Sequence, residues 1–148
     1  MRMRSHVVWL VWMLLFLGGC QVVLKEIADG QQVEFSIVDE KKIPKEMAEC
    51  IEKMAEESFQ ITYVEGGWTY IGQGYGRQET KGYAIRIDKC MEGKDVIGVQ
   101  TTLLGPGSDE IKKDGEELAN VCMREGELSK YPYAVWKIAK NEKPVIFK

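Results

Sequence analysis

The residues that most often perform chemistry in proteins are sparse in this chain of 148 residues. Its single histidine, His6, lies in an N-terminal segment that we expect to be removed. The remainder then has no imidazole for Ser-His-Asp catalysis, for Cys-His catalysis or for metal ligation. The four cysteines are widely spaced and contain no C-x-x-C pair (Cys20, Cys50, Cys90 and Cys122). We therefore expect no metal, no cofactor and no catalytic residue.

An enzyme without histidine would need paired carboxylates, a serine with a lysine, or a reactive thiol. The acidic residues lie largely on one predicted helix and in turns, where a solvated surface explains them. Ser58, Ser108 and Ser129 lie in no recognisable nucleophile motif. Of three functional alternatives for this chain, an envelope enzyme without histidine chemistry is therefore the least favoured.

Cys20 is the one cysteine for which the sequence predicts a reaction. Arg2 and Arg4 precede an apolar run over residues 7–17, and small residues follow in Leu17-Gly18-Gly19-Cys20. A positive segment, a short apolar run and small residues before a cleavage point are typical of a secretory signal. The last four residues resemble a bacterial lipobox, in which the cysteine thiol takes a lipid through a thioether. A plain secretory signal and a transmembrane anchor are the alternatives, although an anchor needs about 20 apolar residues.

These features predict three regions and a place in the cell. We expect residues 1–19 to be a lipoprotein signal peptide, 20–32 a lipid-anchored tether and 33–148 a single domain. The protein would be lipid-anchored at the cell membrane or outer envelope, facing outside the cytoplasm. The net charge of −3 and a pI near 5.3 argue against a nucleic-acid partner, which requires a basic face.

The domain reads as α+β, mainly antiparallel β in a compact sheet or sandwich. After Pro44, Met47, Ile51 and Met54 recur at helical spacing, which predicts an amphipathic helix packed on the sheet. A short second helix is expected near residues 116–124. Strand-like runs with alternating apolar residues fill most of the rest, at 33–37, 59–64, 68–71, 83–87, 96–104, 134–138 and 145–147.

Residues 72–83 hold four glycines between two strand-like runs. Glycine is used where the backbone needs a positive φ or a close approach, so we interpret this stretch as a shaped loop or bulged hairpin. A plain hairpin turn with no functional role is the alternative.

Three stretches together resemble the C-terminal domain of PrcB, a lipoprotein subunit of a bacterial surface protease complex. They are residues 76–85, 103–107 and 131–137, and the resemblance extends over residues 64–148. Lys81 replaces a glycine of the family's usual pair, and residues 112–128 look longer than the family's loop. A weaker similarity links the same loops to chagasin-type inhibitors of cysteine proteases.

The family resemblance implies association with a protease or other envelope protein, and stabilisation of it, with no chemistry of its own. Inhibition of a protease through the three loops is the second alternative. We expect the loops to cluster at one end of the β scaffold, with Tyr83 and Tyr133 as the main anchors. The candidate binding residues are Tyr75, Arg77, Thr80, Lys81, Gly82, Tyr83, Gly105, Pro106, Gly107, Tyr131, Pro132 and Tyr133.

Overall fold

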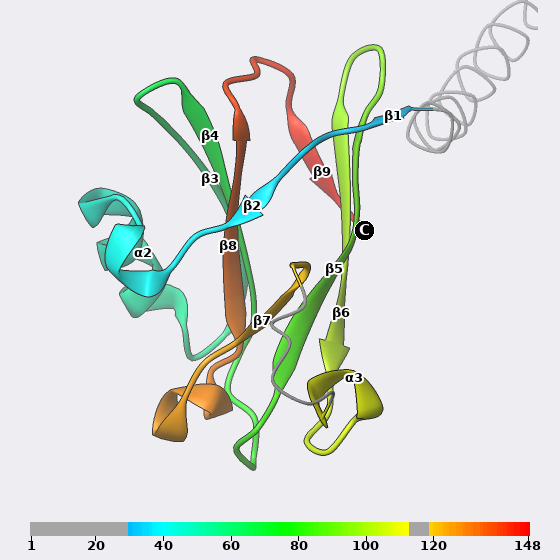
Figure 1. Cartoon of the computed structure of the whole chain (residues 1–148). Helices are drawn as coiled ribbons and strands as arrows, with labels where there is room; N and C mark the ends of the chain where they lie inside the picture. Colours follow the sequence, from blue (N-terminus) through cyan, green and yellow to red (C-terminus); the bar gives the residue numbers. More distant parts are fainter. Residues whose placement is uncertain (1–29, 113–118) are drawn as a thin grey trace, which may run out of the picture.

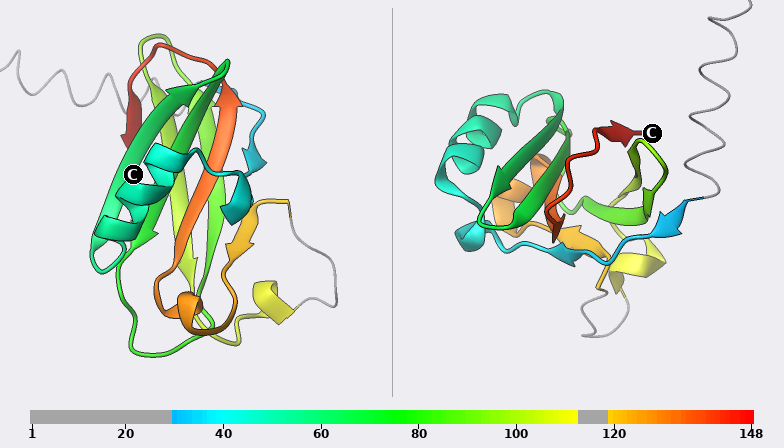
Figure 2. Two further views of the ribbon diagram at one scale, coloured as in Figure 1. Left: turned by 90° about the vertical axis from the view of Figure 1, so that its left-hand side faces the viewer. Right: turned by 90° about the horizontal axis from the view of Figure 1, so that it is seen from above.

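The structure is a computed structural model, and it describes residues 30–112 and 119–148. Two β-sheets lie face to face, and a helix covers the outer face of one of them (Figures 1 and 2). The elements in chain order are β1 (Gln31–Gln32), β2 (Ser36–Ile37), the 3-10 turn η1 (Glu40–Lys42), α2 (Lys45–Met54), β3 (Ser58–Glu65), β4 (Trp68–Tyr75), β5 (Ala84–Glu92), β6 (Ile97–Leu104), α3 (Asp109–Lys112), β7 (Val121–Met123), the 3-10 turn η2 (Gly126–Lys130), β8 (Tyr133–Ala139) and β9 (Val145–Phe147).

One sheet has the order β2-β8-β4-β3, and the other has the order β1-β5-β6-β9 with β7 also paired to β5. All pairs are antiparallel except β6 with β9, which is parallel. The mainly antiparallel class predicted from the sequence is therefore confirmed. The β3–β4 hairpin closes through Gly66 and Gly67, whose φ angles of 58° and 81° suit the two-residue turn that antiparallel strands prefer.

The main core lies between the two sheets. Ile71 and Trp136 from one sheet pack with Ile85 and Ile97 from the other, and all four have no exposed surface. Alternating residues of each strand point into this layer, as expected for two sheets that bury one face each. Each such side chain contributes about 1.5–3 kcal/mol by its burial, so this layer is the main source of stability.

Helix α2 begins directly after Pro44 and packs on the outer face of the β2-β8-β4-β3 sheet (Figure 2). Met47 and Ile51, one turn apart, are buried against a second cluster that includes Phe59 and Val135. Proline suits this position because its missing N–H would have no partner in the first turn. The apolar spacing read from the sequence thus corresponds to the buried face of the helix.

Two glycines that we had assigned to a loop lie inside β4 instead. A Cβ atom at Gly72 would lie 2.8 Å from Ile61 Cγ2 and 3.1 Å from Met47 Cε, and one at Gly74 would overlap the Phe59 ring. Both glycines therefore admit side chains of α2 and β3 to the surface of β4. The predicted loop over residues 72–83 is shortened to residues 76–83.

The second helix predicted near residues 116–124 is wrong over its described part. Residues 121–123 form strand β7, which pairs with Ala84, Ile85 and Arg86 of β5. The free edge of β5 offers this segment ladder hydrogen bonds, and tertiary pairing overrides a weak helical pattern. The residues 116–118 lie outside the described part of the chain.

The N-terminal boundary of the domain also differs in detail. Of the run 33–37, expected as one strand, only Ser36 and Ile37 form a strand (β2), and β1 and β2 belong to different sheets. β1 falls within the stretch expected as a tether, and its partner is the far end of β5 at Met91 and Glu92. Within residues 30–112 and 119–148, no helix is long and apolar enough to cross a membrane.

Candidate functional site

Three connections meet at one end of the sandwich, and we call residues 76–83, 105–108 and 126–132 the loop end (Figure 1). In one sheet, Gly74 near the end of β4 pairs with Tyr133 at the start of β8. In the other, Ala84 at the start of β5 pairs with Leu104 at the end of β6. Each sheet therefore has two neighbouring strands that begin or end at the loop end. The clustering predicted for the three loops is therefore confirmed. The cause is strand direction, because antiparallel neighbours place alternate connections at the same end.

Two hydrogen bonds from backbone N–H groups join two of these loops. The Gln78 N–H donates to the Lys130 carbonyl at 2.7 Å, and the Gly82 N–H donates to Ser129 Oγ at 2.9 Å. The Ser129 hydroxyl, which is 3% exposed, donates in turn to the Gly126 carbonyl at 2.6 Å. Ser129 is therefore an internal brace of the loop end, a role that no sequence motif indicates.

Gly82 connects the third loop to the other two. Its φ is +94°, and a Cβ atom at this position would lie 3.3 Å from Pro106 Cβ. Both the positive φ and the close approach of Pro106 favour glycine here. The candidate residues Gly82 and Pro106, far apart in sequence, are thus direct neighbours.

The first loop is also held at its base. The Tyr75 N–H donates to the Pro132 carbonyl at 3.0 Å, and the Arg77 N–H donates to the Glu56 carbonyl at 3.1 Å. The Gln78 side-chain amide donates to the carbonyls of Tyr75 and Gly76. A loop that is held by its own bonds loses less entropy when it binds a partner.

Six of the candidate residues form the accessible part of the loop end. Lys81 forms a salt bridge with Glu127, which also lies 3.5 Å from Lys130 Nζ. Because Lys81 and Glu127 are both mostly exposed, this pair adds little to stability and can exchange partners. The exposed candidates are Arg77, Thr80, Lys81, Gly105, Pro106 and Gly107.

The aromatic candidates are less exposed than the sequence led us to expect. The Tyr75 hydroxyl is 2.6 Å from Thr101 Oγ1 inside the sandwich, and Pro132 is buried. The Tyr133 ring lies 6.1 Å from the Phe59 ring, and the Arg124 guanidinium lies over it at 3.7 Å. Tyr75 and Tyr133 therefore have structural contacts of their own. Tyr83 and Tyr131 are half-buried, and binding by any of these rings stays a prediction.

The cysteines within the described part of the chain are free, and Cys90 is buried whereas Cys50 is exposed. Burial raises the pKa of the Cys90 thiol to about 11, and it raises the pKa of Cys122 as well. A raised pKa leaves the thiol protonated and poorly nucleophilic. No group of three or more His, Cys, Asp or Glu side chains among these residues is arranged to hold a metal ion.

Comparison with protein families identifies a match to the family described as PrcB C-terminal, over residues 69–139. This segment runs from β4 to the last residue of β8, so it contains the whole loop end. No curated protein and no solved structure matches the chain. The family resemblance inferred from the sequence is therefore confirmed by the family match.

Proposed function

We propose, from the match of residues 69–139 to the PrcB C-terminal family, that the chain is a lipid-anchored envelope module that associates with and stabilises a surface or secreted protease. The observation that carries the proposal is the loop end. Its three connections all lie within the family segment, and they are braced against one another by Ser129, Gly82 and Pro106. Rigid loops on a β scaffold are a common way to present a binding surface.

The position of the loop end supports an anchored orientation. Strand β5 runs from Ala84 at the loop end to Glu92, where β1 pairs with it (Figure 1). The length of β5, at about 3.4 Å per residue, separates these two ends by roughly 27 Å. A lipid on Cys20 would attach the chain through the side at which β1 enters, which is the end of the sandwich opposite the loops.

Inhibition through the same loops is the second candidate. The tip formed by Gly105, Pro106 and Gly107 is exposed, and Pro106 packs so closely on Gly82 that a Cβ atom there would lie 3.3 Å from Pro106 Cβ. Such a narrow tip could enter a protease cleft, as loops of chagasin-type inhibitors do. The two candidates share a surface and differ in the effect on the protease, which a single experiment can separate.

The test is affinity capture of the protease from the cell's own envelope, with the tagged full chain and two matched double variants of it as bait. Arg77→Glu with Lys81→Glu reverses two exposed charges at the loop end, whereas Lys89→Glu with Lys94→Glu reverses two exposed charges on and beyond β5. We expect the first pair to reduce protease recovery by about tenfold and the second to leave it unchanged. Equal recovery from both variants would contradict binding through the loop end.

The activity of the captured protease then distinguishes the two candidates. A stabiliser lengthens the lifetime of the protease in the envelope, and removal of the chain shortens it. An inhibitor lowers the turnover of the protease, and removal of the chain raises it. Recovery of no protease at all would contradict both candidates.

A further inference from the structure

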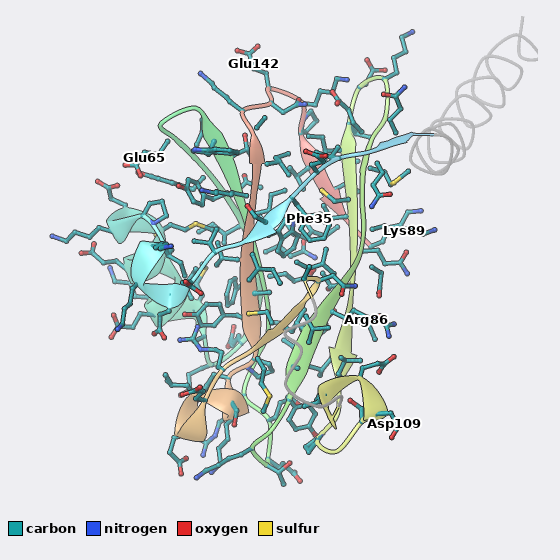
Figure 3. All side chains as sticks on the ribbon, viewed as in Figure 1. Phe35, Glu65, Arg86, Lys89, Asp109 and Glu142 are labelled. Carbon is teal, nitrogen blue, oxygen red and sulfur yellow. The ribbon has the colours of Figure 1, made fainter. Side chains whose placement is uncertain are left out.

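A groove lies on the side of the sandwich where β2 and β7 run along the edges of the two sheets (Figure 1). Its volume is about 900 Å³, and its walls include Phe35, Ile37, Val121, Tyr133 and Val135. Phe35, labelled in Figure 3, lies on the chain segment that enters β2. We call this cavity the side groove. It is separate from the exposed candidates of the loop end, none of which lines it.

Arg124 lines the side groove and has an unused donor. Its side chain is 9% exposed, and Nη2 lies 2.7 Å from Glu40 Oε1. The Nε–H, however, has no hydrogen-bond partner among the described residues. That nitrogen is itself fully buried, so the side chain takes part in the groove through its ion pair with Glu40 and its packing on the Tyr133 ring.

The side groove also exposes apolar surface. Met123 is 49% exposed and Leu128 is 47% exposed, and both line it. Only two other large apolar side chains in the described part of the chain, Val64 and Trp68, are exposed. Exposed apolar side chains grouped beside a cavity are typical of a surface that a partner covers.

The charge around the side groove is strongly unbalanced. Four carboxylates line it, and Arg124 is the only cation that does so among the described residues. Glu40 is paired with Arg124, and Glu110 is paired with Arg86, but both of these carboxylates also face the groove. Asp39 and Glu125 are exposed on its rim. A positively charged occupant is complementary to this rim, and an acidic one is repelled by it.

The strands beside the groove are edge strands. β2 is the last strand of its sheet, and β7 pairs with β5 alone among the described elements. An edge strand can add an extended chain through main-chain hydrogen bonds, whereas alternate side chains select the sequence. In an extended chain, one set of side chains can contact Met123 and Leu128 while the other set faces solvent and the rim.

We propose that the side groove binds an extended segment of a partner protein in which apolar residues alternate with lysine or arginine. The apolar side chains cover Met123 and Leu128, and the basic side chains pair with Asp39 and Glu125. This surface goes beyond the function proposed above, because Leu128 is the only described residue of the loop end that lines it, and none of the exposed candidate residues of that end does. It would give the same partner a second contact, or a different partner its own.

The test uses the full chain in detergent micelles to select the peptides that bind it from a library of random nine-residue sequences. Nine residues in extended form span about 30 Å. We expect enrichment of peptides that alternate apolar and basic residues, with affinity measured by fluorescence anisotropy. Enrichment of acidic peptides, or of none, would overturn the proposal.

Two pairs of variants then locate the binding surface. Asp39→Lys with Glu125→Lys should lower the affinity for the selected peptide by about tenfold. Glu52→Lys with Glu142→Lys, on other surfaces, should leave that affinity unchanged. Met123→Asp should lower the affinity for the peptide by a similar factor. Val64→Asp, which changes an equally exposed residue on β3, is the matched control. Equal affinity in each pair would overturn the proposal. The loop-end variant Arg77→Glu with Lys81→Glu should bind the peptide normally even if it loses the protease.

Discussion

The Tyr75 hydroxyl lies 2.6 Å from Thr101 Oγ1, and this contact joins the two sheets through the interior of the sandwich. Thr101 Oγ1 also lies 2.8 Å from Gln73 Oε1, which can only accept a hydrogen bond. Thr101 must therefore donate its single proton to Gln73, so the Tyr75 hydroxyl donates to Thr101. The buried bonds Tyr75–Thr101–Gln73 connect β4 with β6 near the loop end.

This network predicts an order of stability losses. Tyr75→Phe removes one donor and should lower the free energy of unfolding by about 1 kcal/mol. Thr101→Val should lower it by about 2–3 kcal/mol, because the Tyr75 hydroxyl and Gln73 Oε1 both lose a partner in a buried site. Urea unfolding measures both. A smaller loss for Thr101→Val than for Tyr75→Phe would contradict a network in which Thr101 bonds to both Tyr75 and Gln73.

Gly74 should tolerate no side chain, since a Cβ atom there would overlap the Phe59 ring. We expect Gly74→Ala to lower the free energy of unfolding by about 1–3 kcal/mol, as overpacking usually does. Gly105→Ala is the control, because a Cβ atom at Gly105 would meet nothing within 4 Å. Thermal unfolding with similar losses for both substitutions would show that the ring moves aside freely.

Helix α2 should depend on its buried face. Ile51 is 2% exposed within the second core cluster, so Ile51→Asp places an unpaired carboxylate there and should cost several kcal/mol. Its neighbour Cys50 is exposed, and Cys50→Asp should change the stability by about 0.5 kcal/mol or less. Melting temperatures compare the two variants. An unchanged value for Ile51→Asp would show that the helix does not pack against the sheet in solution.

Stability should fall in acid partly through Glu92. Its carboxylate accepts hydrogen bonds from Lys143 Nζ at 2.8 Å and from Asn141 Nδ2 at 3.0 Å, and these bonds hold its pKa below the ordinary value of about 4.5. A lowered pKa in the folded state means that this stabilisation is complete above the unfolded-state pKa. It is lost as the pH falls through the lower folded-state value.

The variant Glu92→Gln cannot titrate and should therefore lose less stability than the wild type as the pH falls below about 5. Melting temperature as a function of pH measures this difference. Glu52→Gln, on the exposed face of α2, should retain the wild-type dependence. Parallel curves for Glu92→Gln and the wild type would rule out Glu92 as a source of acid sensitivity.

The lipid anchor rests on Leu17-Gly18-Gly19-Cys20 and is tested in cells. Cys20→Ser should abolish both signal processing and incorporation of labelled fatty acid, because the thioether needs the thiol. Cys50→Ser is the matched control and should be labelled normally. Labelling of the Cys20→Ser variant at the wild-type level would exclude the anchor.

The sequence by itself determined the features that depend on neighbouring residues. The pair Gly66-Gly67 between alternating strands specified a hairpin, and the spacing of Met47 and Ile51 specified one buried helix face. The loop end also followed from the sequence. When consecutive strands are antiparallel, the order of the connections already decides which of them share an end.

Tertiary structure decided the features that depend on distant partners. Residues 121–123 form a strand only because the edge of β5 is free beside them, and Gly74 has a packing role only because Phe59 crosses β4 there. Tyr133 lies beneath Arg124, and no local pattern relates these two residues. The side groove arises in the same way, because its walls come from strands of both sheets whose pairing is not encoded in any single segment.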